Sequence, residues 1–447
     1  MESRMLTRRK IILRSLIGLF AALLLTILLA PFWFNLDHYR PQIISYFEKA
    51  TGKKVEIERV SLTLRPQPTI HFVSFAVKSP PLFPPSDIVK VPSADAVLDF
   101  WALLHRNVVI KSVSLDQPKI NIISDPDGPW NFENPSSQNS KNLFPLGIID
   151  KVTINRGQLI ASNLLPSDAQ GPIFLEAFDI DSELDRVDLA AIVNPSSLAL
   201  NGLGKWKAAR LRFASVQATN IDARFRLESR EVVFTNLKAD ICGGKATGDF
   251  SISLAKSTAT FKADARVNGI NIAKLMADFH DLRGLLTGNL DGDLKLAGAI
   301  EHSHNPLSQM RGSGHVKLTN GQVPSLMLNA NLMKLARFND LGPAKENPAS
   351  FSSISTDLEL ENLWITSKVI DIDGYGVDID GSGGISVSGS DELHYQGVAA
   401  ITTKQGFFTN TFARIEGAKL VDGKIQFPFR VDGTLTTPKF SKGAKSD

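Results

Sequence analysis

The sequence has little cysteine and few polar aromatic residues. Its single cysteine, Cys242 in a chain of 447 residues, excludes an intrachain disulfide and a cysteine-based zinc site. Tyrosine (4) and tryptophan (5) are few beside phenylalanine (26). Surfaces that bind sugars or antigens prefer aromatic rings with a polar group. The aromatic composition therefore favours rings that fill apolar space.

Positive charge is in small excess and is concentrated at the N-terminus. The chain has 49 Lys and Arg against 46 Asp and Glu, a net charge of +3. Its first fourteen residues hold five basic residues against one Glu, a local charge of +4, so the remainder carries −1. Because nucleic-acid binding needs a basic face for the phosphates, we expect no nucleic-acid partner.

Motifs that carry catalysis or hold a cofactor are missing. The sequence has no G-x-S-x-G elbow, phosphate-binding loop, dinucleotide fingerprint or H-E-x-x-H helix. The carboxylates of 371–380 lack EF-hand spacing, so we interpret them as the exposed positions of two strands around a turn at 374–376, with calcium as the alternative. His302 and His304 are a weak candidate metal pair in a loop. We expect no catalytic residue, metal or cofactor, and no enzyme.

One long apolar run is present, from Leu16 to Phe34. Its 19 residues carry no charge and would reach roughly 28 Å as a helix, about the hydrocarbon thickness of a bilayer. The preceding basic residues and the aromatic residues at its end fit the positive-inside rule and an interfacial belt. The span residues are Leu16, Ile17, Leu19, Phe20, Leu23, Leu24, Leu25, Ile27, Leu28, Leu29, Phe32, Trp33 and Phe34.

A cleaved signal peptide is the alternative interpretation of this run. Its apolar region would be 7–15 residues long with a small-x-small site, whereas Pro31 directly follows Leu28-Leu29-Ala30. We therefore expect a single-pass signal anchor within 1–35, with a cytoplasmic N-terminus. No second run of this length follows, so the body is expected on the far side of one membrane.

Beyond the anchor, the hydrophobic pattern has a period of two. Apolar and charged residues alternate through 221–228, and the alternation recurs in 261–267, 290–296 and 425–431. This pattern predicts a mainly β chain of antiparallel hairpins. Turn signals that separate the runs contain glycine: Gly243-Gly244, Asp373-Gly374, Gly383-Gly384, Asp422-Gly423 and Asp432-Gly433.

The sequence predicts only a few short helices and a few boundaries between modules. Spacing and breakers predict short helices over 40–52, 100–105, 272–284 and 328–341. Polar, breaker-rich segments at 134–141, 301–306 and 342–348 separate the modules. The expected organisation is a basic tail and anchor (1–35), an N-terminal β module (36–135), a middle sheet (136–300), a C-terminal β region (301–440) and a polar tail (441–447).

Short motifs along most of the chain resemble the AsmA family of bacterial envelope proteins. The match is weakest over 162–216. The motifs are Asp37-His-Tyr-Arg-Pro41, Ala50-Thr-Gly52, Leu62-Thr-Leu64-Arg-Pro66, Trp130-Asn-Phe132, Gly284-Leu-Leu-Thr-Gly288, Gly374-Tyr-Gly376 and Phe427-Pro-Phe429-Arg-Val431-Asp-Gly433-Thr-Leu435.

The resemblance implies an elongated, taco-like antiparallel β-groove, akin to chorein-type bridge-like lipid-transfer proteins. It implies a periplasmic body anchored in the inner membrane that moves or binds phospholipid for outer-membrane biogenesis. From the pattern alone, a sheet with one apolar face needs a second sheet, helices or an apolar ligand over it. Candidates for the lining are Ile221, Phe225, Leu227, Phe261, Val267, Leu290, Leu294, Leu296, Ile425, Phe427, Phe429 and Val431.

Two other classes of function stay open at this point. A non-enzymatic assembly factor would act on outer-membrane proteins through protein contacts, with a polar or aromatic-rimmed patch in place of an apolar lining. An envelope hydrolase would need a nucleophile, a metal or an acid pair, and none of these emerges from the sequence.

Overall fold

The computed structural model describes the chain in separate stretches. The predicted span 16–34 and the pair His302 and His304 lie outside them. Among the described residues, none belongs to a helix that is both long and apolar enough for a bilayer. The described residues are 35–64, 66–105, 107–125, 130–132, 148–164, 170–188, 202–213, 216–228, 231–253, 259–277, 283–300, 309–324, 326–335, 349–388, 390, 392–402 and 418–443.

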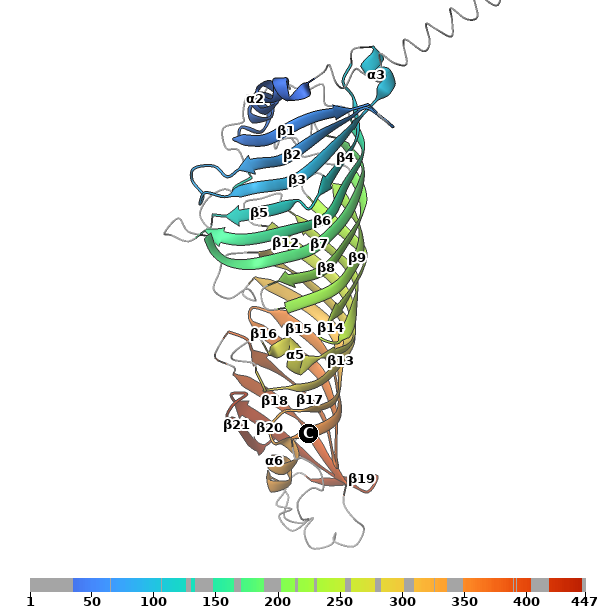
Figure 1. Cartoon of the computed structure of the whole chain (residues 1–447). Coiled ribbons are helices and arrows are strands. Elements are labelled where there is room, and N and C mark those ends of the chain that lie inside the picture. Colours follow the sequence, from blue (N-terminus) through green and yellow to red (C-terminus); the bar gives the residue numbers. More distant parts are fainter. Residues whose placement is uncertain are drawn as a thin grey trace, which may run out of the picture. The chain divides into compact units, whose positions relative to one another are not determined.

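The chain divides into two compact units, Met1–Trp206 and Lys207–Asp447. Both units are built mainly of strands, which confirms the predicted mainly β class (Figure 1). The module boundaries expected near 135 and 300 fall beside stretches outside the described residues and stay predictions.

The first unit opens with two helical segments packed on its sheet. Helix α2 begins with Pro41 in its first turn and ends at Gly52, whose φ of 67° is the left-handed conformation that glycine adopts easily. The helix expected over 40–52 is therefore confirmed. The elements of this unit are η1 (Leu36–Tyr39), α2 (Arg40–Thr51), β1 (Val55–Thr63), β2 (Thr69–Lys78), β3 (Asp87–Leu98), α3 (Phe100–Leu104), β4 (Ile110–Asp116), β5 (Lys119–Ser124), β6 (Ile148–Leu164) and β7 (Gln170–Asp188).

One part of this sheet departs from the predicted antiparallel hairpins. Strands β1, β2, β3 and β4 pair antiparallel in sequence order, but β4 and β5 both pair with β6 in parallel. A parallel pair needs a crossover of about a dozen residues or more, and 23 residues separate Ser124 from Ile148. The prediction of hairpins alone was wrong here, because alternation is the same in both kinds of pairing.

The second unit is an antiparallel sheet throughout its described pairings. Strand β8 (Gly202–Phe213) contains the boundary between the units. The later strands are β9 (Val216–Glu228), β10 (Glu231–Ile241), β11 (Gly244–Ser253), β12 (Ala259–Asn271), β13 (Thr287–Ile300), β14 (Met310–Gln322), β15 (Ser350–Glu361), β16 (Trp364–Gly374), β17 (Val377–Ser386), β18 (Leu393–Thr402), β19 (Lys419–Val421), β20 (Lys424–Gly433) and β21 (Pro438–Lys442). Each strand from β9 to β18 pairs with the next, and β18 then pairs with β20.

Short helices begin where the spacing predicts them, but α5 ends well before the predicted end at residue 284. They are α3 in the first unit and α5 (Ile272–Met276) and α6 (Leu328–Leu335) in the second. The prediction that Gly383-Gly384 forms a turn was wrong, because both residues lie inside β17. A Cβ on Gly383 would lie 2.2 Å from the carbonyl oxygen of His394, so this glycine allows a close approach of two strands.

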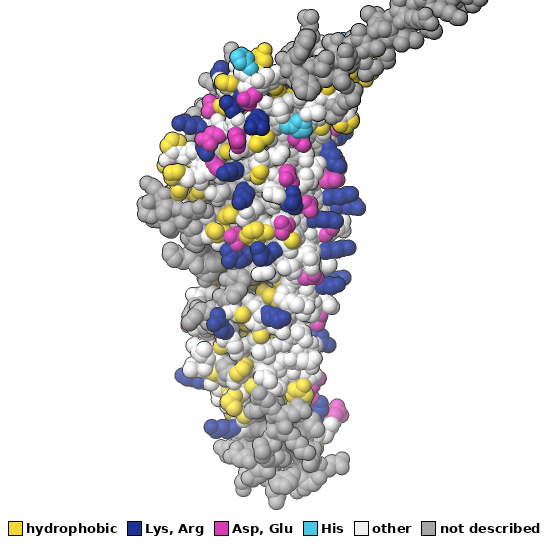
Figure 2. All heavy atoms as spheres, in the orientation of Figure 1, with side chains coloured by type: hydrophobic (Ala, Val, Ile, Leu, Met, Phe, Trp, Pro, Cys, Tyr) yellow, Lys and Arg dark blue, Asp and Glu magenta, His cyan; other side chains and the backbone are white. Residues whose placement is uncertain are grey.

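The two faces of the second unit differ in chemistry. On β9, Ile221, Ala223 and Phe225 are buried while Asp222 and Arg224 between them are exposed. Charged residues on the exposed face pair across strands, for example Arg266 with Asp293 at 2.7 Å, Lys368 with Glu359 at 3.0 Å and Lys295 with Asp264 at 3.8 Å. Figure 2 shows basic and acidic side chains interspersed over the visible surface. We call the opposite side the apolar face of the second unit.

Candidate functional site

Four phenylalanines form a row on the apolar face across β9 to β12. Phe225 pairs directly with Phe234, and Phe234 with Phe250. Their ring centroids are 6.0 and 6.2 Å apart, and Phe250 stacks on Phe261 at 6.3 Å. Cross-strand aromatic pairs stabilise a sheet and order its side chains. We call Phe225, Phe234, Phe250 and Phe261 the phenylalanine ladder.

Glycines on the neighbouring strands reduce the height of the side chains on this face. A Cβ on Gly312 would lie 2.6 Å from Cδ2 of Leu296, and one on Gly298 would lie 3.0 Å from Cε1 of Phe261. The large side chain therefore lies across the glycine of the adjacent strand. A face built in this way has an apolar lining of low relief.

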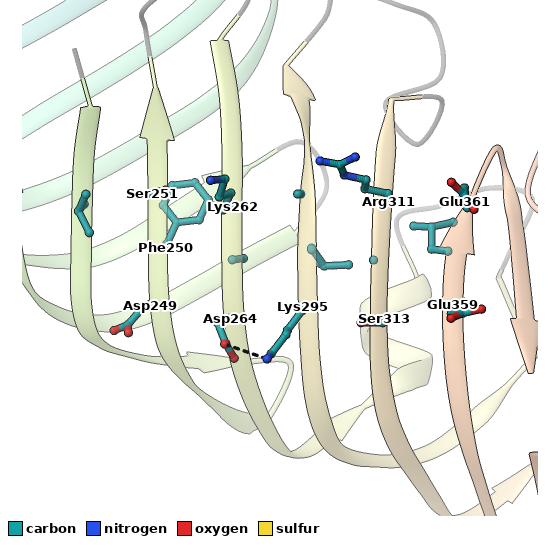
Figure 3. Close-up of a pocket in the computed structure, with 16 residues that line it drawn as sticks. Asp249, Phe250, Ser251, Lys262, Asp264, Lys295, Arg311, Ser313, Glu359 and Glu361 are labelled. Carbon is teal, nitrogen blue, oxygen red and sulfur yellow. Dashed lines mark ion pairs between the residues drawn. The ribbon is translucent and has the colours of Figure 1, made fainter. Parts of the chain in front are cut away.

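A shallow hollow of about 610 Å³ lies over β10 to β15 (Figure 3). Most of the side chains that line it belong to the exposed face, among them Lys262, Arg311 and the ion-paired Asp264 and Lys295. Between these charged rows runs an apolar row that the strand register places side by side and whose side chains point to the apolar face: Phe250, Ala263, Leu296, Gly312 and Leu360. The small residues Ala263 and Gly312 leave space between the larger side chains of this row.

The ladder and the apolar row beside it form the open part of the apolar face. The side chains of Phe234, Phe250 and Phe261 are only half-buried, as are Leu294, Leu296 and Leu360. Phe225 is closer to full burial, with 8% of its surface exposed. Half-buried aromatic and aliphatic side chains in one contiguous row form a surface that an apolar ligand can cover.

The same face is closed further along the sheet. From Leu318 of β14 and Phe351 of β15 to β20, its side chains join a large core in which Phe427 is 2% exposed and Ile401 fully buried. Helices α5 and α6 contribute Ile272 and the fully buried Leu332 to this core. This closed part is filled by the protein's own side chains.

One tyrosine lies in the closed part with its hydroxyl in reach of a buried serine. The Oη of Tyr395 is 3.5 Å from Oγ of Ser367, which is only 3% exposed. Burial raises the pKa of the Tyr395 hydroxyl above its ordinary value. The hydroxyl is therefore held neutral, as a closed core requires.

The sequence-predicted lining residues fall into two groups. One group belongs to β9, β12 and β13, on or near the open part: Ile221, Phe225, Leu227, Phe261, Val267, Leu290, Leu294 and Leu296. Within this group, Leu290 also packs against the closed core. The other group belongs to β20 and lies inside that core: Ile425, Phe427, Phe429 and Val431.

Sequence reasoning missed Phe234 and Phe250, two of the four ladder residues. Strand β10 carries a bulge between Phe234 and Leu237, with Asn236 at a φ of 53°, and this bulge breaks the period of two. In β11, the alternation holds, but Gly248 stands at an apolar-face position and so weakens the hydrophobic signal before Phe250. A search for every phenylalanine between two predicted turns, without the requirement of strict alternation, would have found both residues.

The carboxylates of 371–380 take the positions expected for two strands around a turn. Asp371 pairs with Asp380 and Asp373 with Asp378, on the exposed face of β16 and β17. Asp378 forms an ion pair with Lys424 of β20. Within the described part of the chain, no three His, Cys, Asp or Glu side chains gather as a metal site would require.

A comparison with protein families gives one match. The model described as "AsmA family" matches residues 5–152 and 200–366, more than half of the chain. The stretch between these ranges overlaps 162–216, where the sequence resemblance is weakest. No curated protein and no solved structure matches the chain.

Proposed function

This chain belongs to the AsmA family, and we propose that it binds or conducts phospholipid over the open part of its apolar face. In this proposal it is a non-enzymatic protein of a bacterial envelope, and residues 16–34 anchor it in the inner membrane. Its body lies in the periplasm and contributes to outer-membrane biogenesis and lipid homeostasis.

The observation that carries the proposal is the contrast between the two parts of one face. In the closed part of the face, Ile401 and Phe427 are buried. In the open part of the same face, Phe250, Phe261 and Leu296 are only half-buried. Apolar surface left in water is unfavourable, and each CH₂ group buried against it contributes about 0.8 kcal/mol. Acyl chains supply such groups in a linear array, which suits a row of half-buried side chains.

The extent of the closed core limits where a lipid can lie on this face. We place the lipid over β9 to β13 and the adjoining parts of β14 and β15, because Leu318 of β14 and Phe351 of β15 already belong to the closed core.

Photo-crosslinking of the full chain in its membrane tests the proposal. A photoreactive residue at Phe261 should capture phospholipid, detected by mass spectrometry of the crosslinked protein. The matched control is Lys262, whose side chain points to the opposite, exposed face. A second control is Phe427, which should crosslink only to protein because the closed core surrounds it.

Two results would contradict lipid binding. Equal capture at Phe261 and Lys262 would show non-specific contact with lipid. Crosslinks from Phe261 only to other proteins, with no lipid at any position, would favour the assembly-factor alternative.

A further inference from the structure

An exposed apolar patch lies on α3 and the segment after it, away from the apolar face. Trp101 is 69% exposed, Leu104 60% and Val108 63%, and Phe100 and Val109 are exposed beside them. Single exposed apolar side chains are normal on a protein surface. Five of them within ten residues form a contiguous patch, and such a patch marks a contact surface. We call these five residues the α3 patch.

The patch is held in place by a network around one aspartate. Asp99 caps α3, with its Oδ1 accepting a hydrogen bond from the backbone N–H of Ala102 at 2.8 Å. The same carboxylate pairs with Nζ of Lys111 at 2.9 Å, and the Asp99 N–H donates to the carbonyl of Val109 at 2.8 Å. The bonds that the carboxylate accepts from Ala102 and Lys111 favour its ionised form and lower the pKa of Asp99. The segment therefore has a defined conformation that presents its apolar side chains outward.

Strand register places the patch at the end of the sheet where the described chain begins. The N–H of Val60, in the second half of β1, donates to Oδ1 of Asp37 in η1, so the start of the described chain lies beside that half of the strand. The last residue of β1, Thr63, pairs with Thr69, and Thr69 pairs with Val97 near the end of β3. Helix α3 follows directly. Figure 1 shows α2 above β1 and α3 where the first strands converge at the upper right.

We propose that the α3 patch inserts into the interface of the phospholipid bilayer that residues 16–34 cross. This proposal rests on the anchor of the proposed function and adds a second membrane contact to it. The apolar run ends at Phe34, one residue before the described chain, so the bilayer surface lies close to Asn35. A patch at that strand end faces the same surface.

The composition of the patch fits a bilayer interface. Tryptophan is enriched at the level of the headgroups, where its ring is buried and its N–H stays hydrated. Trp101 packs edge-on against Phe100, with ring centroids 5.6 Å apart, so the two rings form one continuous apolar surface. Leu104 and Val108 extend the apolar surface beside them.

Depth measurement on the full chain in nanodiscs tests this contact. With Cys242→Ser as background, single cysteines replace Leu104, Leu82 or Leu25 and carry an environment-sensitive fluorophore. The nanodiscs contain phosphatidylcholine, phosphatidylglycerol and a doxyl-labelled phosphatidylcholine as quencher. Leu82 is the matched control: it is 54% exposed and lies in the loop between β2 and β3, at the other end of β3. The 12 residues of β3 separate the two positions by about 40 Å.

The labels at positions 104 and 25 should emit at shorter wavelength and be quenched by the doxyl lipid, while the label at 82 should show neither effect. Quenching at 25 but not at 104 would overturn the patch proposal and leave the anchor intact. A blue shift at 104 without quenching would mean that protein covers the patch, which also overturns it. An unquenched label at 25 would refute the anchor, and the patch proposal would fail with it.

Discussion

Replacement of two phenylalanines of the second unit by alanine should separate a lipid-binding surface from a packed core. Phe427→Ala removes a ring that is 2% exposed within the closed part. Phe250→Ala removes a half-buried ring of the ladder. Both substitutions delete the same atoms from strands of one sheet, so the difference between them reports how much protein surrounds each ring.

The structure sets the expected magnitudes. A Phe→Ala change in a packed core costs about 3–5 kcal/mol, because the lost burial is joined by a residual cavity. Full burial of a phenylalanine ring contributes about 1.5–3 kcal/mol to stability, and burial of half the ring contributes about half of that. Phe250 also loses ring contacts with Phe234 and Phe261, at 6.2 and 6.3 Å. Each such contact contributes about 0.5–1.5 kcal/mol at most. We expect a loss of about 2 kcal/mol for Phe250→Ala.

Urea unfolding of the delipidated full chain, followed by circular dichroism, measures these losses. Phospholipid that copurifies with each variant is counted by mass spectrometry. Phe427→Ala should lose more stability and retain its lipid, whereas Phe250→Ala should lose less stability and bind less lipid. An equal loss of stability in the two variants, with lipid content unchanged in both, would refute the division into an open and a closed part.

Three further predictions concern packing, pH and topology. Gly383→Ala should reduce the free energy of unfolding in urea by about 1–3 kcal/mol, because its Cβ would lie 2.2 Å from a backbone oxygen. Gly384→Ala, whose Cβ would have its nearest contact at 3.1 Å, should reduce it less. Equal reductions in the two variants would contradict the close approach at Gly383. The pKa of Tyr395 is raised above 10.0 in the folded chain, so its contribution to stability is present below about pH 10 and lost as the pH rises further. Tyr395→Phe should therefore reduce the loss of stability in alkali, and an unchanged pH profile would show that the hydroxyl ionises as freely as in the unfolded chain. Alkaline phosphatase, which is active only outside the cytoplasm, should be active when fused after Gly52 and inactive after Lys10, and the reverse pattern would refute the anchor.

The sequence alone determined the class of fold, because the alternation of apolar and polar residues within each strand shows which residues lie on each face. Alternation in 221–228 identified β9 and its buried side, since successive side chains of a strand point to opposite faces whatever its partner is. Local chemistry also predicted helix α2, from Pro41 and Gly52 at its ends. The exposed carboxylates of 371–380 followed from the same period of two.

Tertiary structure decided which apolar residues meet and which of them remain open. Phe261 and Phe427 have the same local pattern, yet Phe261 is a half-buried ring of the ladder and Phe427 belongs to a core that α5 and α6 complete. The parallel pairing of β5 with β6 and the inward Gly383 likewise depend on which strand comes alongside. Strand period is a local property of the backbone, whereas burial is set by whatever packs over a face. The sequence could therefore identify the apolar face, and only the assembled sheet could divide it into an open and a closed part.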